Sequence, residues 1–301
     1  MLEKQGFFAA RRLAALAAFA IFTGCGSAAC CTAPPIHPAA GPTATPVPGV
    51  PTPTPTPSPV GAPTPTPSPV PTATPTPIPT ATPRVALSCA QNAATGAAVP
   101  LGTAATFAVL AASTVTNTGP TLVTGDLGVS PGNAVTGFGP GTGTVIGGSI
   151  HAGDPTAAQA QLDTTTAYNN AAGRAPFAVP ADIGGLVIPP GVWRAPVSLA
   201  ITGNVTLDGQ NDPNAVFIFQ MASTLTASTG STVTLINFAN PCNVFWQVGS
   251  SATINANSIF NGTILALASV SVLTGTTVNG RLLAQNGAVS LLSDVITRPG
   301  P

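Results

Sequence analysis

The stretch that decides the fold is NGTILA at residues 261–266, which returns eighteen residues later as NGRLLA at residues 279–284. A repeat of this length is typical of one coil of a solenoid, in which each coil contacts only its neighbours. A single coil cannot bury its apolar side chains, whereas stacked coils place like residues about 4.8 Å apart and form a continuous core. We therefore expect a β-solenoid.

The same pattern extends toward the N-terminus. Residues 244–248 (VFWQV) match residues 216–220 (VFIFQ), and each stretch is followed by a small-polar strand and then by a third strand. Residues 107–111, 114–116 and 122–125 have the same three-part form. The third strands are centred on the apolar residues Val205, Val233, Phe260 and Val278. Short β-type runs separated by glycine predict an all-β domain.

One segment of this domain is predicted to be helical. Asp154 is a good N-cap, Pro155 suits the first helical position, and Gly173 can end the helix. The intervening residues contain no helix breaker. The side chains expected on the face that packs against the rest of the domain recur at three- and four-residue steps: Ala158, Leu162, Thr165 and Tyr168 or Asn169.

The ends of a solenoid expose strand edges that need protection. Two irregular stretches, residues 137–148 and 178–190, are expected to serve as caps or crossovers. Cys89 and Cys242 are the only cysteines after residue 84. Export to an oxidising compartment would let them pair and staple the N-terminal lead to the solenoid, which makes them a disulfide candidate.

The N-terminal 31 residues have the order of a secretory signal: basic residues, the apolar run 13–22, then small residues. The run is too short to span a bilayer as an anchor. Residues 22–25 (FTGC) resemble a bacterial lipobox, so we expect Cys25 to be lipidated; ordinary signal cleavage is the alternative.

Residues 32–84 repeat Thr-Pro and Ser-Pro units and contain almost no large apolar side chain. Such a segment cannot form a core, and alternating proline favours an extended, polyproline-like chain of about 3 Å per residue. We interpret it as a stalk, with a passive linker as the alternative. The folded domain then occupies residues 85–301, and the protein is expected to be secreted or lipid-anchored at a bacterial cell surface.

Composition excludes several classes of partner and site. The chain has 8 basic and 8 acidic residues, a net charge of zero and no basic cluster, which argues against nucleic acid and acidic membrane surfaces. His151 is the only histidine of the folded domain, so no histidine cluster can bind a metal. The aspartates lie singly beside turn residues and form no readable acid pair. We expect no catalytic residue, metal or cofactor; Asp208 and Asp294 would be the acids to test in a polysaccharide-acting enzyme.

The middle strand of each coil presents short polar side chains outward, because strand residues alternate between the two faces of a sheet. One outward column is predicted to contain Thr114, Thr224, Ser251 and Ser269. The neighbouring column is predicted to contain Thr116, Ser198, Thr226, Thr253, Ser271 and Val289. The residues expected to point inward are Val115, Leu225, Ala252, Val270 and Ala288.

This face would be flat, regular and nearly uncharged. Spaced threonines combine weak hydrogen bonding with small apolar patches, which favours ordered, lattice-like water. β-Branching stiffens threonine at χ1 and lowers the entropy cost of docking to a rigid crystal. The face is therefore suited to ice, although threonine ladders also occur in strands that bind nothing.

Several motifs in order resemble the DUF3494 family of microbial ice-binding (antifreeze) proteins: GDLGVSPG at 125–132, AYNNAAGR at 167–174, DPNAVFIFQ at 212–220 and NVFWQVG at 243–249. The likeness covers residues 99–297. It implies a right-handed, discontinuous β-solenoid of triangular cross-section with a long helix along one side. It also implies adsorption to the ice crystal surface, without a cofactor, through the two columns. We expect the protein to be a monomer.

The outward columns contain three predicted interruptions, Pro196, Gly287 and Val289. These favour ice adhesion or mild inhibition of recrystallisation over strong thermal hysteresis. A cell-surface adhesin or structural module of the same fold is the leading alternative, and a polysaccharide-active enzyme is the second.

Overall fold

A computed structural model of the chain describes residues 97–300. The expected signal at residues 1–31, the lipidation site Cys25, the stalk at residues 32–84 and Cys89 lie outside the described residues. The described part is a β-solenoid with one long helix, as expected.

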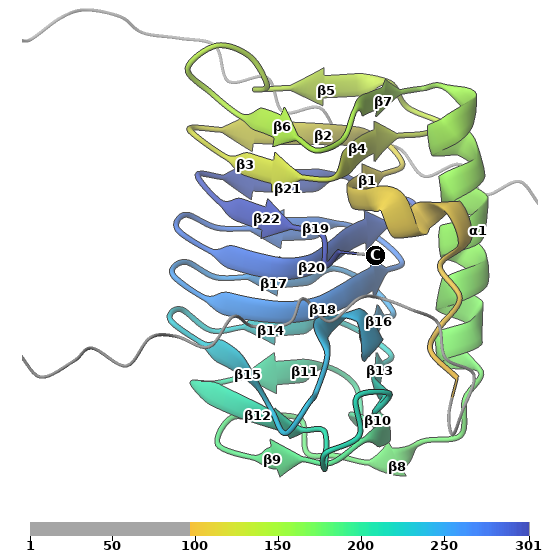
Figure 1. Cartoon of the computed structure of the whole chain (residues 1–301), viewed down its shortest axis with the longest axis vertical. Coiled ribbons are helices and arrows are strands. Elements are labelled where there is room, and N and C mark those ends of the chain that lie inside the picture. Colours follow the sequence, from red (N-terminus) through yellow and green to blue (C-terminus); the bar gives the residue numbers. More distant parts are fainter. Residues whose placement is uncertain (1–96, 301) are drawn as a thin grey trace, which may run out of the picture. The chain divides into compact units, whose positions relative to one another are not determined.

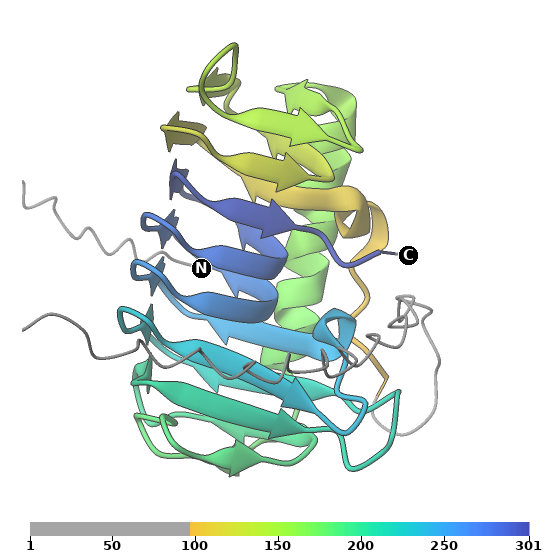
Figure 2. The same cartoon turned by 60° about the vertical axis from the view of Figure 1, so that its left-hand side comes forward.

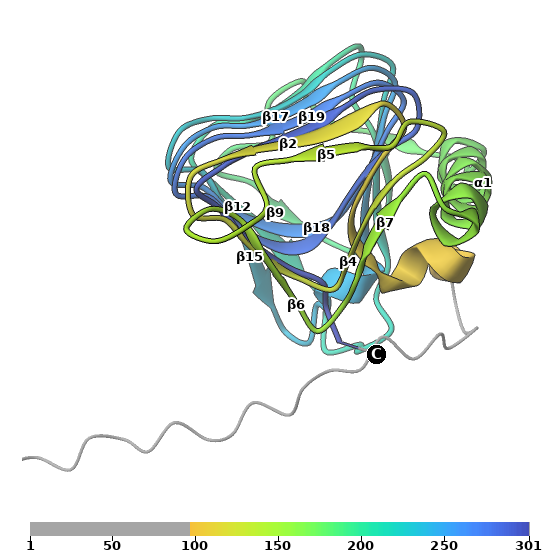
Figure 3. The same ribbon diagram turned by 90° about the horizontal axis from the view of Figure 1, so that it is seen from above.

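The strands wind into right-handed coils that form a triangular prism (Figure 3). The helix face contains β1 (Phe107–Ala111), β4 (Asp126–Val129), β7 (Ile150–Ala152), β8 (Phe177–Ala178), β10 (Gly191–Arg194), β13 (Phe217–Met221) and β16 (Val244–Val248). The hydroxyl face contains β2 (Thr114–Thr118), β5 (Ala134–Thr136), β11 (Leu199–Ile201), β14 (Leu225–Ala227), β17 (Ala252–Ile254), β19 (Val270–Val272) and β21 (Val289–Leu292). The third face contains β3 (Leu122–Thr124), β6 (Thr144–Ile146), β9 (Val187–Ile188), β12 (Asn204–Asp208), β15 (Thr232–Ile236) and β22 (Val295–Thr297).

Two long strands, β18 (Ile259–Ala266) and β20 (Thr277–Ala284), run from the third face onto the helix face. They turn this corner at Gly262 and Gly280, which pair in register. Gly262 has a φ of +112°, and a Cβ on Gly280 would lie 1.8 Å from the carbonyl oxygen of Gly262. The corner therefore requires glycine in both coils, which explains why the NG dipeptide repeats.

The coils do not stack in the order of the sequence. β1 pairs with β20 on one side and with β4 on the other, so the first coil of the chain lies beside the last (Figures 1 and 2). The helix α1 (Pro155–Ala172) carries the chain from the β7 end of the stack to the β8 end (Figure 1). This is the discontinuous solenoid that the family resemblance implied.

Helix α1 begins and ends where the sequence predicts, but its packing face was predicted wrongly. The Asp154 side chain accepts a hydrogen bond from the backbone N–H of Ala157 at 2.8 Å. Leu162, expected to be on the packing face, is 64% exposed. The buried positions are Ala157, Ala160, Thr164, Ala167 and Ala171. Small side chains let the helix lie close to a flat sheet. The spacing of the alanines therefore indicates the packing face of this helix, and the position of the leucine does not.

The central strands β1, β13 and β16 of the helix face are buried on both sides, which is why they read as continuous apolar runs. In β13, Phe217 and Phe219 point into the prism while Ile218 packs toward α1. Inside the prism, Trp246 stacks on Phe219 with ring centroids 4.2 Å apart. The predicted third-strand centres, from Val205 to Val278, are all buried there. Trp193 packs on the same core but is only partly buried.

The register of β13 differs from the sequence alignment by one residue. We matched residues 216–220 with residues 244–248, but Phe217 pairs with Val244 and Phe219 with Trp246. A one-residue slip would send every side chain to the opposite side of the sheet. Burial inside the prism therefore selects the register that puts Phe219 and Trp246 together.

The two irregular stretches lie at the ends of the stack, as expected of caps. β6 and β7 end the larger sheet on one side, β8 and β9 end it on the other, and β5 and β11 are the end strands of the smaller sheet. β8 and β9 are only two residues long, and Pro176, Pro180 and Pro189 flank them. Short edges next to prolines discourage pairing with another chain.

Candidate functional site

The hydroxyl face carries two outward rows of small side chains that run along the stack. In pairing order the first row contains Ser198, Thr224, Ser251, Ser269, Ala288, Thr114 and Ala134. The second row contains Ala200, Thr226, Thr253, Ser271, Ser290, Thr116 and Thr136. Nine of the ten residues predicted for this face do lie on it.

The tenth residue, Val289, was predicted wrongly. It pairs with Val270 and Val115, is fully buried, and leaves Ser290 in the second row. The reason is one extra residue in the connection: Val270 follows Ala266 by four positions, but Val289 follows Ala284 by five. Because strand alternation has a period of two, this insertion reverses inside and outside.

Two further positions need correction for related reasons. Ala288, expected inside, is half-buried in the first row. Ser198 lies in the first row rather than the second, because it precedes Leu199, which pairs with Leu225. The rows are thus interrupted by alanines at 134, 200 and 288, and not by Pro196, Gly287 and Val289 as predicted.

Sequence reasoning missed Ser290 and Thr136. Their signals were present: VSL at residues 289–291 repeats VSV at 270–272, and AVT at 134–136 repeats TVT at 114–116. The repeat at 134–136 lies directly before residues 137–148, which the glycines mark as irregular, and it was not included in the predicted columns.

The rows form a two-dimensional array with a regular spacing. Neighbouring coils lie about 4.8 Å apart, and outward residues two positions apart along a strand are separated by about 6.7 Å. Thr226, Thr116 and Ser290 are exposed, and Thr253 and Ser271 are half-buried by their neighbours. Every position of both rows is serine, threonine or alanine, so neither row carries a charge.

Hydroxyls of the first row tie adjacent coils together. The Ser198 hydroxyl accepts from the Thr224 hydroxyl at 3.1 Å, and the Ser251 hydroxyl accepts from the Ser269 N–H at 3.3 Å. The Ser269 hydroxyl in turn accepts from the Ala288 N–H at 3.2 Å. These bonds fix the oxygen positions and keep the array rigid.

The second row is freer to bind water. Thr116 donates to Ser290 at 3.2 Å. The hydroxyls of Thr226, Thr253 and Ser271 make no hydrogen bond with other groups of residues 97–300. Three adjacent coils therefore offer donors and acceptors on a flat surface, with β-branched threonine side chains held stiff at χ1.

Asp208 and Asp294, the acids to test for a hydrolytic site, share no hydrogen-bond partner among residues 97–300, and each binds its own turn. Asp208 accepts from the Gln210 N–H and from the Asn237 amide, so it fixes a turn. Asp294 is buried and accepts from the N–H groups of Thr276 and Leu292. Burial raises the pKa of Asp294 to about 6.

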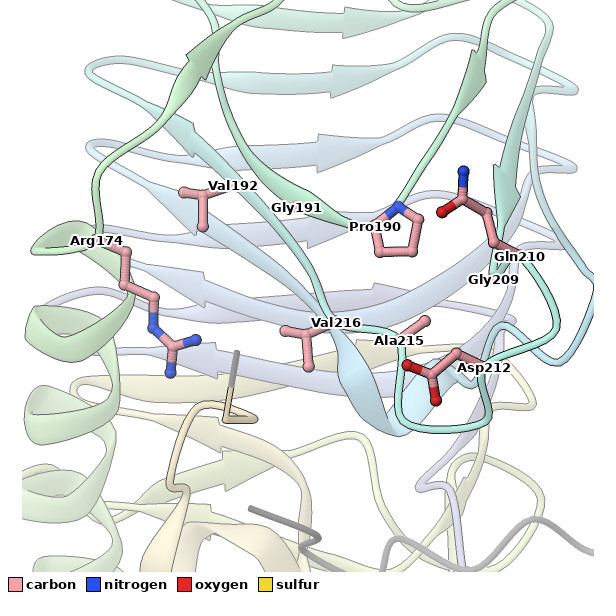
Figure 4. Close-up of a pocket in the computed structure, with 9 residues that line it drawn as sticks. All are labelled: Arg174, Pro190, Gly191, Val192, Gly209, Gln210, Asp212, Ala215 and Val216. Carbon is pink, nitrogen blue, oxygen red and sulfur yellow. The ribbon is translucent and has the colours of Figure 1, made fainter. Parts of the chain in front are cut away.

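A pocket of about 360 Å³ near the end of α1 holds one acid and one base, Asp212 and Arg174, on opposite sides (Figure 4). Asp212 accepts from the Asn214 N–H, as a turn aspartate does. Arg174 donates to the Asn170 side chain and to the Ala98 carbonyl. The pocket supplies no acid pair for hydrolysis.

His151 lies at the start of α1, where its Nδ1 is 2.7 Å from the Asp154 carboxylate. Residues 97–300 contain no group of three metal-ligating side chains. Within this range no helix is long and apolar enough to cross a membrane. Cys242 is disulfide-bonded, and since Cys89 lies outside the described residues, their pairing stays a prediction.

Comparison with known proteins gives one consistent answer. The family model described as ice-binding-like matches residues 109–297. An ice-binding protein of Nostoc sp. (strain HG1) is 48% identical over 64% of this chain and 71% of its own length. An ice-binding protein of Colwellia sp. is 36% identical over 67% of this chain and 84% of its own length.

Solved structures agree with this likeness. The crystal structure of an ice-binding protein from an Antarctic biological consortium is 46% identical, has a TM-score of 0.64, and matches over 66% of this chain and 90% of its own. That of an ice-binding protein from Antarctomyces psychrotrophicus is 37% identical, has a TM-score of 0.65, and matches over 68% of this chain and 100% of its own. The fold, the matched residues and these relatives together show that the chain belongs to the ice-binding-like (DUF3494) family.

Proposed function

We propose that the protein adsorbs to ice through the two rows of the hydroxyl face. The observation that carries this proposal is the uncharged, rigid array of hydroxyl and methyl groups. In its second row, the hydroxyls of Thr226, Thr253 and Ser271 make no hydrogen bond to other groups of residues 97–300 and can bind water. Such an array orders water without holding it around ions. The relatives named ice-binding proteins support the same function.

The protein acts without catalysis and without a cofactor in this proposal. It is exported as a monomer, and a lipid on Cys25 and the Thr-Pro stalk would hold the solenoid away from the cell. The alanines at 134, 200 and 288 remove three hydroxyls from the array. We therefore propose ice adhesion or inhibition of recrystallisation as its activity.

Ice-affinity partition tests the function and the face together. The wild type and a Thr226→Tyr/Thr253→Tyr variant are compared on a slowly grown ice surface, with Thr277→Tyr/Thr297→Tyr on the third face as the matched control. The wild type and the control should enter the ice, and the first variant should stay in the liquid. Exclusion of a folded wild type would refute ice binding, and glycan and cell-adhesion assays would then test the adhesin alternative.

A further inference from the structure

A groove of about 800 Å³ opens on the third face, away from the hydroxyl face. Its wall includes Ile236, Phe238 and Ile259, which are 38%, 59% and 50% exposed. Pro241 and Pro299 also line it, beside polar residues such as Thr234 and Asn261. Phe238 is held outward with a φ of +65°, a conformation that a residue with a bulky side chain adopts at an energetic cost. An exposed aromatic ring on a strained backbone indicates a surface that another segment covers.

A disulfide lies at the edge of this groove. Cys242 follows the groove residue Pro241 in η2 (Pro241–Asn243), is buried, and is disulfide-bonded. Cys242 is the only cysteine among residues 97–300. Its partner therefore belongs to the part of the chain before residue 97.

Chain length favours Cys89 as that partner. Val99 packs in the same apolar cluster as Phe245, which is three residues after Cys242. Cys89 precedes Val99 by ten residues, which can span about 33 Å. Cys25, Cys30 and Cys31 would have to close far longer loops, at a larger cost in chain entropy.

The residues before Cys89 have the pattern of a strand with one apolar side. In the sequence Val85-Ala86-Leu87-Ser88-Cys89, Val85, Leu87 and Cys89 alternate with small side chains. An extended segment would direct these three to the same side, with about 6.7 Å between successive ones. With Cys89 bonded to Cys242, that side faces the groove.

We propose that residues 85–89 lie extended across this groove, anchored by a Cys89–Cys242 disulfide, with Leu87 and Val85 against Phe238 and Ile259. Forming the bond removes two electrons and two protons from the two thiols. A protein disulfide of the export compartment accepts them by thiol–disulfide exchange and is reduced to a dithiol.

This arrangement would attach the stalk at the corner of the prism that is marked by the C-terminus in Figure 3, away from β17 and β19. The hydroxyl face would thus stay clear of the tether. The proposal does not depend on ice binding, since it concerns only the groove and the disulfide.

Tryptic mapping of the exported full chain without reduction, with thiols blocked, identifies the partner of Cys242. Trypsin can cut after Arg84, Arg174, Arg194 and Arg281, so Cys89 and Cys242 fall on peptides 85–174 and 195–281. All other cysteines precede Arg84. A disulfide-linked pair of peptides 85–174 and 195–281 is expected. A link from peptide 195–281 to the peptide that ends at Arg84 would overturn the proposal.

Docking in the groove is tested separately with Leu87→Glu and its neighbour Ala86→Glu as the matched control, each with the disulfide verified. Leu87→Glu should lower Tm by roughly 4 °C, because it removes a buried leucine from a domain of this size, and Ala86→Glu should not. Native-state trypsin cleavage after Arg84 should be faster only in Leu87→Glu. Equal Tm and equal cleavage rates in the two variants would show that the groove is not the docking site.

Discussion

The hydroxyl of Thr116 donates a hydrogen bond to the hydroxyl of Ser290 at 3.2 Å, although 174 residues separate them in the chain. The bond crosses the line where the first coil meets the last. It places Ser290 in the second outward row and, by alternation, Val289 inside the prism. The array is therefore continuous across the join between the two ends of the described chain.

Substitutions at these neighbouring positions should have opposite effects. Ser290→Tyr should abolish entry into ice with Tm unchanged, because a large ring on a flat face holds the crystal away. Val289→Thr should lower stability by about 1–2 kcal/mol, since it buries a hydroxyl, and should leave ice binding intact. Ice partition and thermal unfolding measure both effects. A Ser290→Tyr variant that enters ice like the wild type would contradict the register.

The C-terminal end of α1 depends on Gln220 of β13. This buried amide donates to the carbonyls of Ala171 and Arg174, each at 2.8 Å. Gln220→Leu leaves both carbonyls without this donor, so we expect a loss of about 2 kcal/mol and a Tm lower by roughly 4–8 °C. Gln159→Leu, on the exposed side of the helix, should change Tm little. Equal Tm values for the two variants would refute the capping role.

Asp294 should make stability fall as pH rises from about 4 to about 6. Burial raises its pKa from the ordinary value of 3.8 to about 6, so the folded state holds a proton that the unfolded chain releases. The stability from this group is complete below about pH 4 and is lost as pH rises through the folded value, a change of about 2–3 kcal/mol.

Urea unfolding between pH 4.5 and 7 measures this slope. Thr276 and Leu292 donate to different oxygens of Asp294, so Asp294→Asn keeps an acceptor for one of them only and should lower stability at every pH, but it cannot titrate and should flatten the slope. The pKa values of Asp163 and Asp182 are lowered by hydrogen bonds from Thr103 and Gly184. These two groups therefore change the stability of the domain only at pH values below this window. A wild-type slope that persists in Asp294→Asn would assign the effect to another group.

The corner between the third face and the helix face should not tolerate a side chain. Gly280→Ala would place a Cβ against the Gly262 backbone and should destabilise the domain by about 3 kcal/mol or more. Gly139→Ala has open space around it and should be close to neutral. Comparable Tm values for the two variants would show that the corner can widen.

The sequence predicts the fold well because periodicity is a local signal. The eighteen-residue repeat, the third-strand centres and both ends of α1 follow from spacing and capping alone. The failures have two causes. Whether Val289 or Ser290 faces outward depends on one inserted residue, which only an alignment of residues 289–291 with residues 270–272 reveals. Whether Leu162 or Ala160 contacts the sheet depends on how close two backbones come, which is a property of packing that no single segment encodes.

The length of helix α1 has a consequence for how this protein can evolve. Its 18 residues span about 27 Å, and it runs along the stack from β7 to β13, seven strands and thus six spacings of about 4.8 Å. The length of the helix and the height of these seven strands therefore agree to within about half a helical turn. Duplicating a coil would outgrow the helix unless about three residues were added to it. Two distant insertions, one coil in the stack and one turn in the helix, must therefore occur together before each row of the array can gain a position.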